Sequence, residues 1–472
     1  MVLTSAHAFV ELDSTVLNRM NRQGPRYTSY PTADRFTPGF GLDDYLDAVT
    51  SSRSSDAVRP LSLYVHIPFC ESLCYYCACN KIITKDHDKA RVYLEYLARE
   101  IDMQAALFSQ RDQVEQMHFG GGTPTYLSHE QMTALVSNLR NKFNFVDESE
   151  GEFSIEIDPR TVDEARIHQL RDLGFNRLSM GVQDFEEEVQ RAVNRIQPEI
   201  QTLTAIRAAR DAGFLSVSID LIYGLPKQTL ETMERTISKV IAASPDRISI
   251  YSYAHMPQLF KSQGLMADTD LPSPEVKLQM LGYCIAALTD AGYIYIGMDH
   301  FAKPEDGLSR ALAEGRLHRN FQGYSTHAEA EILALGVSGI SGIGGTYSQN
   351  EKSLKKYYAR LDEGVIPVAR GIRLSEDDKL RRTLIQMLAC HFRIDKLAIE
   401  REFGLDFDSH FSQELDKLEE MERDGFVVRT QGSIEVTERG RLVVRVICMV
   451  FDRYLGQPRA ETLTRMPYSK TI

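Results

Sequence analysis

Short β-like runs alternate with helical segments from Leu61 onward, and this alternation is what most limits the possible folds. The runs, rich in apolar and β-branched residues, lie at 61–68, 116–121, 153–159, 177–183, 217–224 and 247–254. The segments between them carry apolar residues at three- and four-residue spacing, which is typical of amphipathic helices. Repeated strand–helix–strand units build a parallel sheet. Because a closed eight-fold barrel needs ~250 residues and the alternation fades near Ala254, the sequence predicts an α/β fold with a partial (β/α)6, TIM-like barrel.

The segments on either side of this repeat differ from it in character. Residues 1–60 predict a helix near Ser14–Arg22, an extended arm over 24–36 and a polar linker over 51–60. Residues 61–372 are expected to form the barrel with an extension, and residues 373–472 a helical, winged-helix-like C-terminal domain. From Ser375 to Leu455 there are 13 basic and 17 acidic residues, a net of −4 (13 − 17), which favours a packing or lid role over DNA binding.

The overall composition excludes several classes of protein. Net charge is −12 and mean hydropathy is −0.28, and no apolar run reaches the ~18–20 residues of a membrane span. The first residues do not resemble a secretory signal, and the seven cysteines are an odd number. We therefore expect a cytoplasmic protein that binds neither membrane nor nucleic acid.

Four of the cysteines fall within ten residues, directly after the first β-like run. Cys70, Cys74, Cys77 and Cys79 form a C-x3-C-x2-C-x-C pattern, whereas the other three cysteines lie in apolar helical contexts. Three thiolates on one loop suit a 4Fe–4S cube with one iron left open for chemistry. Structural zinc and redox-active thiols remain alternatives, although zinc commonly takes two separated pairs of ligands. The spacing favours the cluster.

A second motif, FGGGTPT at 119–125, follows the second β-like run. Consecutive glycines allow a ligand to approach the backbone closely, and they also occur in tight turns. Because ligands bind at the carboxyl ends of parallel strands, we expect this loop and the cysteines to meet at one edge of the sheet.

These motifs resemble those of the radical S-adenosylmethionine enzymes, and a wider set resembles the oxygen-independent coproporphyrinogen III oxidases of haem biosynthesis. The matching segments, which span the chain from about Pro25 to the C-terminal module, are PRYTSYPT, YVHIPFC, CACNK, HFGGGTPTYL, SIEIDP, RLSMGVQDF, IDLIYGLPKQT, YAHMP, GMDHFA and HRNFQGY. The resemblance implies a 4Fe–4S cluster and two molecules of S-adenosylmethionine as cofactors.

The resemblance also implies a role for individual residues. Cys70, Cys74 and Cys77 would bind the cluster, and Cys79 would be tied to activity without binding it. Contacts to the first S-adenosylmethionine would come from Tyr64, Gly121, Glu156 and Ile340. Contacts to the second would come from Tyr76, Gly122, Thr123, Gln183, Arg195, Asp220 and Ala254. Tyr76 stands where relatives often carry Phe.

Simpler roles for some of these residues stay open from the sequence alone. Asp220 suits a helix cap and Arg195 a surface ion pair. His66 and His300, which lie at strand ends, suit hydrogen-bonded structural groups better than metal ligands.

The implied reaction converts two propionates of coproporphyrinogen III to vinyl groups through a 5′-deoxyadenosyl radical, giving protoporphyrinogen IX. The expected partners are this substrate and an unidentified electron donor and acceptor, and the chain is expected to act as a monomer. Arg26 and Arg35 in the arm are candidate ligands of the substrate carboxylates. The alternatives are a haem-binding, haem-trafficking relative, another radical reaction on a tetrapyrrole, and a zinc-stabilised protein without enzymatic activity.

Overall fold

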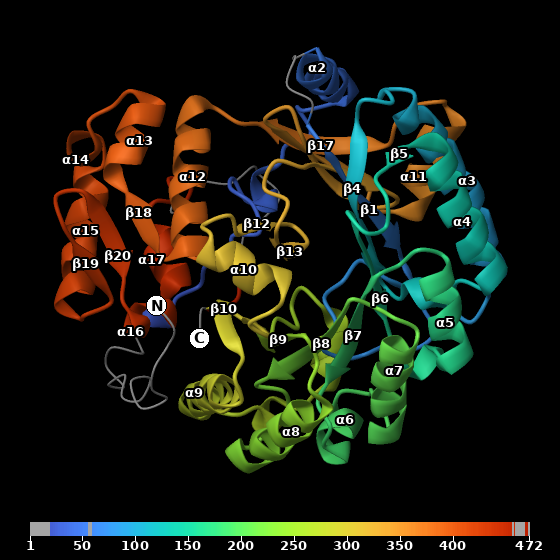
Figure 1. Ribbon diagram of the computed structural model, residues 1–472, viewed down its shortest axis with the longest axis horizontal. Helices are drawn as coiled ribbons and strands as arrows, with labels where there is room; N and C mark the ends of the chain where they lie inside the picture. Colours follow the sequence, from blue (N-terminus) through green and yellow to red (C-terminus); the bar gives the residue numbers. More distant parts are fainter. Residues whose placement is uncertain (1–18, 55–58, 456, 458–467, 471–472) are drawn as a thin grey trace.

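A twisted, largely parallel sheet forms the centre of the computed structural model, which describes residues 19–54, 59–455, 457 and 468–470 (Figure 1). Each of the six predicted runs is a strand: β1 (Leu61–Ile67), β4 (Gln113–Gly121), β6 (Glu152–Ile157), β7 (Arg177–Gln183), β8 (Ser216–Tyr223) and β9 (Arg247–Ser252). They pair in parallel in this order, which confirms the predicted partial barrel. The described strands leave β10 and β17 as the two ends of an open sheet.

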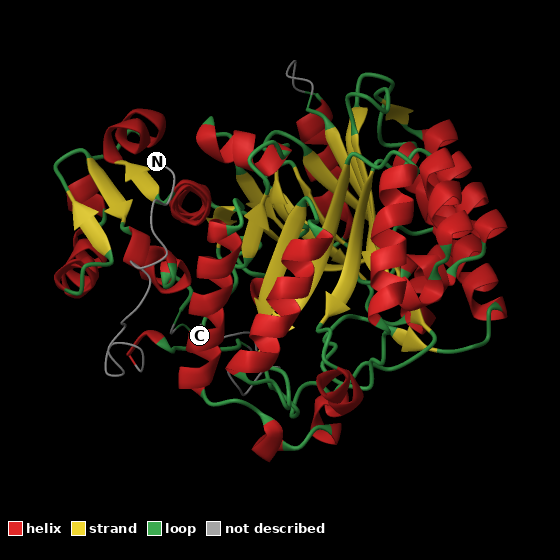
Figure 2. Ribbon diagram, turned by 60° about the horizontal axis from the view of Figure 1, so that its bottom comes forward, coloured by secondary structure: helices red, strands yellow, loops and turns green. Residues whose placement is uncertain are grey.

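Amphipathic helices connect the parallel strands and cover the outer face of the sheet (Figure 2). They are α3 (Asp88–Ala105), α4 (His129–Lys142), α5 (Glu164–Asp172), α6 (Glu187–Ala192), α7 (Glu199–Asp211) and α8 (Leu230–Ala243), followed by α9 (Pro274–Asp290). In α8, Met233, Ile237 and Val240 are fully buried, as the three- and four-residue spacing predicts. Thr229 caps this helix by accepting a hydrogen bond from the backbone of Thr232.

Both edges of the sheet formed by the six predicted strands carry further strands, mostly antiparallel, that the sequence pattern did not predict. Beyond β1 lie β14 (Glu331–Leu335), β15 (Ile340–Ile343), β16 (Thr346–Asn350) and β17 (Val368–Arg373), and β14 pairs with β1 in parallel. Beyond β9 lie β11 (His300–Ala302) and β10 (Ile294–Gly297). The glycine-rich segment 336–346 suggests a loop by composition, and strand pairing with β14 and β16 decides its structure.

Shorter elements complete this region. They are β2 (Phe69–Cys70), β3 (Ile82–Ile83), β5 (Asn144–Phe145), α10 (Gly307–Ala313), the hairpin β12 (His318–Asn320) and β13 (Gly323–Ser325), and α11 (Leu354–Asp362). Short 3-10 turns lie at Pro124–Tyr126, Pro159–Thr161, Lys261–Leu265 and Asp268–Asp270.

The C-terminal region has the predicted winged-helix order. It comprises α12 (Glu376–His391), β18 (Arg393–Asp395), α13 (Lys396–Phe403), α14 (Phe407–His410), α15 (Ser412–Arg423), β19 (Val427–Arg429), β20 (Ser433–Val436), α16 (Glu438–Arg441) and α17 (Val444–Val450). The three strands form a separate sheet in the order β18–β20–β19. Its apolar core also includes Met20, Tyr27 and Tyr30 from the N-terminal arm.

The N-terminal arm runs between the C-terminal region and the barrel. Arg445 on α17 donates to the carbonyl oxygen of Gly24 at 2.7 Å, and the Tyr27 hydroxyl donates to Asp452 at 3.0 Å. The arm is extended as predicted except for a 3-10 turn at Ala33–Arg35. The helix expected near Ser14–Arg22 lies mostly outside the described residues.

The linker prediction for residues 51–60 is wrong in part. A helix, α2 (Leu42–Arg53), extends into this segment. It forms because Tyr45, Ala48 and Val49 lie on one face and pack into the core, which outweighs the polar composition of its end.

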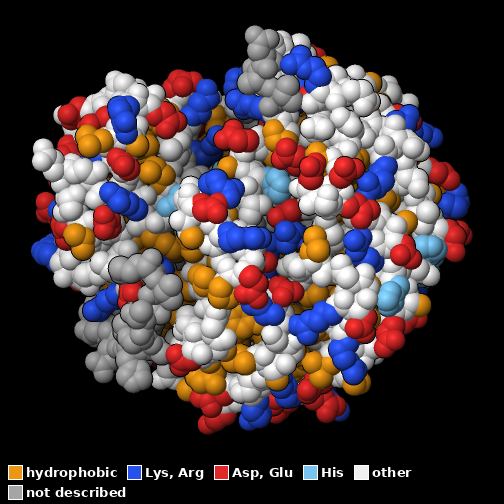
Figure 3. All heavy atoms as spheres, in the orientation of Figure 1, with side chains coloured by type: hydrophobic (Ala, Val, Ile, Leu, Met, Phe, Trp, Pro, Cys, Tyr) orange, Lys and Arg blue, Asp and Glu red, His pale blue; other side chains and the backbone are white. Residues whose placement is uncertain are grey.

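None of the helices in the described ranges combines the length and the apolar character that crossing a lipid bilayer requires. On the face shown in Figure 3, acidic and basic side chains are interspersed.

A buried carboxylate ties α3 to the extension of the sheet. Glu100 accepts hydrogen bonds from the Gly336 backbone at 2.7 Å, the Asn350 amide at 2.7 Å and the Tyr357 hydroxyl at 2.5 Å. Burial outweighs these bonds and raises the pKa of Glu100 to about 7. The folded chain therefore retains a proton here that the unfolded chain releases near pH 4.3.

Because the unfolded chain loses this proton at a lower pH than the folded chain, the folded state becomes less stable as pH rises. We expect the free energy of unfolding to fall by about 3 kcal/mol between roughly pH 4.5 and 7 on account of Glu100, and Glu100→Gln to remove this part of the pH dependence. Urea unfolding across that pH range measures it, with Glu95→Gln, an exposed position on the same helix, as the control. If Glu100→Gln and the native chain show the same slope, the assignment is wrong.

Candidate active site

A cavity of about 730 Å³ opens at the carboxyl ends of the parallel strands. Its walls contain the four clustered cysteines and most of the residues predicted to bind cofactors: Cys70, Cys74, Tyr76, Cys77, Cys79, Gly121, Gly122, Thr123, Glu156, Gln183, Arg195 and Asp220. Segments that are far apart in the sequence meet here because the strands preceding them are neighbours in one parallel sheet.

Tyr64, Ile340 and Ala254 do not line this cavity. Tyr64 lies on β1, where its hydroxyl is 3.2 Å from Nδ1 of His66 and its ring stacks on His118. Ile340 begins β15. Ala254 follows β9 and lines a smaller cavity of about 280 Å³. The Gln263 amide donates to the carbonyl oxygens of both Ala254 and Tyr76, so this second cavity adjoins the first.

The glycine triplet allows the loop after β4 to lie directly against the cysteine segment. A Cβ on Gly122 would stand 2.8 Å from the backbone of Pro68 and Phe69, and Gly121 has φ +119°. The Gly122 N–H donates to Ile67 at 2.8 Å, and the Thr123 N–H donates to Phe69 at 2.9 Å. Close backbone approach therefore explains the glycines, whatever the cavity binds.

The cysteines differ in their surroundings. Burial raises the pKa of the Cys70 thiol to about 11, and its Sγ lies 3.3 Å from the Thr123 hydroxyl. A hydrogen bond with Cys79 lowers the pKa of Cys77 to about 6, and the nearby Lys81 ammonium favours the same thiolate. Thiolate is the form that binds metal.

The cysteines fit a 4Fe–4S cluster better than a single metal ion. In the ranges that the structure describes, no three His, Cys, Asp or Glu side chains group closely enough to hold one metal ion. Tetrahedral zinc requires such a group. The thiolates of a 4Fe–4S cube bind different irons and need only face one cavity, which Cys70, Cys74 and Cys77 do.

Two guanidinium groups lie beside Cys74. Arg195 donates to Cys74 Sγ at 3.6 Å and to Asp158 at 2.9 Å, and Arg160 donates to the same two groups at 3.7 Å and 2.7 Å. Arg195 is only 7% exposed, so the surface ion pair that its sequence context suggested is wrong. Its Nε has no hydrogen-bond partner among the described residues, which leaves a buried donor for a ligand.

The inner face of the barrel is polar near this cavity. His118 Nε2 lies 3.2 Å from Glu156, and the Gly121 N–H donates to the same carboxylate at 3.3 Å. The low polarity around Glu156 raises its pKa, but the hydrogen bond and charge of His118 outweigh this and lower it. Burial and the Glu156 carboxylate raise the pKa of Asp220 to about 6.

Asp220 lies within β8 and is not a helix cap, so that simpler interpretation is also wrong. Ser179 donates to it at 3.3 Å. His118 and Ser179 were missed because each looks like an ordinary strand residue. The available signal was alternation: polar residues at every second position of neighbouring strands share one face of the sheet.

The two histidines at strand ends behave differently. His66 is a hydrogen-bonded group between Tyr64 and the Asn80 carbonyl, as expected. His300 packs edge-on against Tyr251 and Tyr324 instead, and its Nδ1 is buried without a hydrogen-bond partner among the described residues.

The two arginines of the arm lie in different places. Arg26 lines the cavity that contains the cysteines and donates to the carbonyl oxygen of Ser252 at the end of β9. Arg35 contacts the Tyr454 backbone and ring instead. Arg26 therefore remains a candidate for substrate binding, and Arg35 is placed in the contact between the arm and the C-terminal region.

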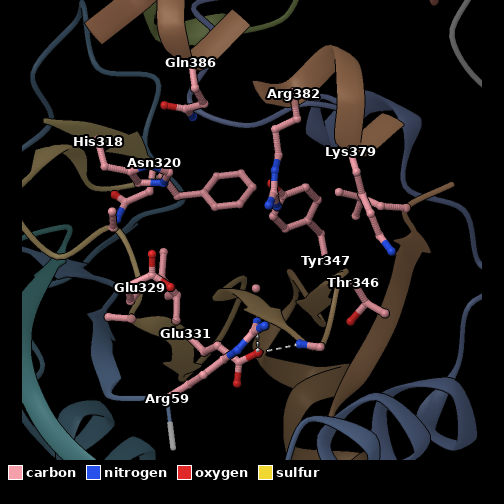
Figure 4. Close-up of a pocket in the computed structure, with 18 of the residues that line it drawn as sticks. Arg59, His318, Asn320, Glu329, Glu331, Thr346, Tyr347, Lys379, Arg382 and Gln386 are labelled. Carbon is pink, nitrogen blue, oxygen red and sulfur yellow. Dashed lines mark hydrogen bonds and ion pairs between the residues drawn. The ribbon is translucent and has the colours of Figure 1, made fainter. Parts of the chain in front are cut away.

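A cavity of similar size, about 710 Å³, lies at the amino ends of β1 and β14 (Figure 4). Arg59, Tyr347, Lys379 and Arg382 are among its lining residues, and none of the predicted site residues is. The candidate active site is therefore the cavity at the carboxyl ends.

Known protein families and enzymes match this chain along most of its length. The profile of the Radical SAM superfamily matches residues 64–240, and that of the HemN C-terminal domain matches residues 374–443. The oxygen-independent coproporphyrinogen III oxidase of Pseudomonas aeruginosa is 49% identical over 463 residues, covering 98% of this chain and 99% of its own. The enzyme of the same name from Escherichia coli is 49% identical and covers 95% and 96%.

A solved structure extends the likeness to three dimensions. The coproporphyrinogen III oxidase of Escherichia coli, described as a radical SAM enzyme, superposes with a TM-score of 0.89 at 48% identity, covering 94% of this chain and 100% of its own. This chain therefore belongs to the oxygen-independent coproporphyrinogen III oxidases, a family of radical S-adenosylmethionine enzymes.

Proposed function

We propose that this chain converts two propionate side chains of coproporphyrinogen III to vinyl groups, giving protoporphyrinogen IX in haem biosynthesis. Each conversion removes one hydrogen from the carbon next to the ring, carbon dioxide and one electron. The observation that carries the proposal is the joint placement of Cys70, Cys74 and Cys77 with the glycine loop in one cavity, in a chain 49% identical to enzymes of that name.

Three thiolates of this cavity would hold the 4Fe–4S cluster: those of Cys70, Cys74 and Cys77. When bound, the cluster and S-adenosylmethionine supply a 5′-deoxyadenosyl radical that removes hydrogen from the substrate. The protein's part is to position these groups and to exclude water from them.

The first S-adenosylmethionine would lie against the loop after β4. The Gly121 backbone and Glu156 line the cavity next to the cysteines, and Glu156 is held in place by His118. A lowered pKa keeps Glu156 ionised, so it accepts hydrogen bonds from an ammonium or from hydroxyl groups. Tyr64 packs behind this site, and Ile340 is proposed to complete it.

The second S-adenosylmethionine would lie between Tyr76, Gly122, Thr123, Gln183, Arg195, Asp220 and Ala254. Asp158 anchors the Arg195 guanidinium, and its Nε has no hydrogen-bond partner among the described residues, so this group can pair with a carboxylate in a fork. Asp220, with a pKa of about 6, is mostly ionised at neutral pH and can accept both hydroxyls of a ribose. Cys79 is proposed to act in catalysis without binding the cluster.

The arm and α17 support enclosure of the cavity. Arg445 on α17 holds the arm at Gly24, and the arm places Arg26 in the cavity wall. We propose that these segments cover the substrate during the radical steps. We further propose that the chain acts in the cytoplasm as a monomer without nucleic acid, with a separate electron donor and acceptor.

Anaerobic reconstitution with iron and sulfide, followed by turnover of coproporphyrinogen III, tests this function. The expected product is lighter than the substrate by two carbon dioxide molecules and four hydrogens, and its formation depends on S-adenosylmethionine. Haem binding without this product would indicate a trafficking protein, and a methylated or ring-opened product would indicate another tetrapyrrole reaction. Either result would overturn the proposal.

A further inference from the structure

Four cationic side chains from separate segments lie close together; of these, Arg26 lines the active-site cavity, Lys277 the smaller cavity that adjoins it and Arg319 the other large cavity. They are Arg26 of the arm, Lys277 of α9, Arg319 of β12 and Arg445 of α17. Arg26 and Lys277 donate to the carbonyl oxygens of the adjacent residues Ser252 and Tyr253, and Arg445 donates to those of Gly24 and Pro25, which directly precede Arg26. The charge of Arg319 lowers the pKa of Arg445. Asp299 is the one carboxylate that the described residues place in an ion pair with any of them, 3.3 Å from Arg26.

Among the described residues, three of these cations have only neutral hydrogen-bond partners. Arg319 is 3% exposed, and its Nε and Nη1 have no hydrogen-bond partner among the described residues. Arg445, which is 9% exposed, donates to the carbonyl oxygens of Gly24 and Pro25, and Lys277 donates to that of Tyr253. Buried charges are normally paired, and Asp299 is too little negative charge for four cations within the described residues.

The pKa values show the same deficit of negative charge. Burial lowers the pKa of Arg445 to about 10 and that of Lys277 to about 8, and the charge of Arg26 lowers both further. Burial, followed by the charge of Arg319, lowers the pKa of His300 to about 3, so its ring is neutral. A bound anion would relieve this repulsion.

An aromatic wall connects the cluster to the cavity. The Arg26 guanidinium lies 5.7 Å from the ring of Tyr251, which itself lines the cavity. Tyr251 contacts His300 edge-on at 5.8 Å, and His300 contacts Tyr324 in the same way at 5.1 Å. Arg319 lies over Tyr324 at 4.7 Å. An uncharged aromatic surface therefore runs between cations at its two ends.

We propose that Arg26, Arg319 and Arg445, together with Lys277, bind the propionate carboxylates of the tetrapyrrole, and that its macrocycle lies against Tyr251, His300 and Tyr324. This inference rests on the proposed function, which supplies the tetracarboxylate substrate. Four cations against one carboxylate leave three positive charges for ligands. Two propionates remain in the product, so they require anchors that last through both rounds of reaction. Arginine suits this role because its planar fork pairs with carboxylates in two-bond geometry.

Coproporphyrin III, the stable oxidised and fluorescent tetracarboxylate, is the probe, and its tetramethyl ester is the uncharged comparison. Both are titrated into the anaerobically reconstituted native protein and its variants. Arg319→Gln is expected to weaken binding of the acid roughly tenfold or more while leaving binding of the ester unchanged. Arg319→Lys should recover part of the loss. With coproporphyrinogen III, Arg319→Gln should raise KM and leave kcat nearly unchanged.

Arg382→Gln is the control for the other large cavity, because both Arg319 and Arg382 line it and Arg382 has no ion pair in the described residues (Figure 4). It is expected to change neither affinity. Equal binding of the acid by native protein and Arg319→Gln would overturn the inference, and so would a loss in Arg382→Gln as well, which would place the ligand in the other large cavity. Arg26 is partly exposed, so Arg26→Gln serves as a second variant if Arg319→Gln does not fold.

The two proposals fail in different ways. If the protein binds coproporphyrin III selectively and through Arg319 but makes no protoporphyrinogen, the proposed function is contradicted and this binding site is supported. Normal turnover with an unchanged KM in both the Arg319→Gln and Arg26→Gln variants would contradict this binding site and support the proposed function.

Discussion

Cys70→Ala is expected to abolish cluster assembly and to lower turnover of coproporphyrinogen III by a hundredfold or more. Each thiolate of a three-cysteine motif holds a different iron, so the loss of one leaves a second iron without a protein ligand. Changes to residues behind metal ligands alone typically cost 10–100-fold. Iron and sulfide analysis of anaerobically reconstituted protein measures assembly, and product formation measures turnover.

Two other cysteines make this experiment specific. Cys79→Ala should keep the iron content of the native protein while losing activity, because Cys79 lies in the same cavity but is not proposed as a ligand. Cys284→Ala, at a buried position on α9, should keep both iron and activity. Native iron content in Cys70→Ala, or loss of iron in Cys284→Ala, would contradict the assignment of ligands.

Gly122→Ala is expected to destabilise the fold by about 1–3 kcal/mol and to lower activity by about a hundredfold. The added Cβ would stand 2.8 Å from the backbone of Pro68 and Phe69, and backbone atoms there cannot rotate away as a side chain does. The segment that carries Cys70 would have to move by a fraction of an ångström or more. Misplacement by about 1 Å at a reacting centre costs about a hundredfold in rate.

The control for this substitution is a glycine with free space around it. Gly282 lies in α9, and a Cβ added there would meet nothing within 4 Å, so Gly282→Ala should stabilise the protein by about 0.5–1 kcal/mol. Urea unfolding and anaerobic turnover measure both variants. Native stability and activity in Gly122→Ala would show that the two loops do not pack as described.

The central part of the fold could be predicted because its signals are local. Each of the six parallel strands is a short apolar run flanked by amphipathic helical segments. The spacing of apolar residues that marks a strand or a helix can be recognised within a few residues of sequence. Strand β15 was missed because glycine and serine dominate residues 336–346, and β14, β16 and β17 were missed because their pairing partners lie elsewhere in the chain. α2 was missed for the same reason, since its apolar face is recognised only when packed.

The candidate site, like the fold, could be predicted from the sequence only in part. The cysteine spacing and the glycine triplet are contiguous motifs, and the rule that ligands bind at the carboxyl ends of parallel strands brings them together. The simpler roles suggested for Arg195 and Asp220 failed because burial was not visible: Arg195 is enclosed beside Asp158, and Asp220 lies in the barrel region next to Glu156. His118 carried no motif at all.

The sequence by itself determined the parallel strand–helix repeat, the cysteine spacing and the glycine loop, because each depends on residues that are near one another in the chain. Only the tertiary structure decided where the sheet ends, and which charges are buried without partners. Arg319 and Arg445 are far apart in the chain and buried, and packing alone leaves each without an ion-pair partner among the described residues.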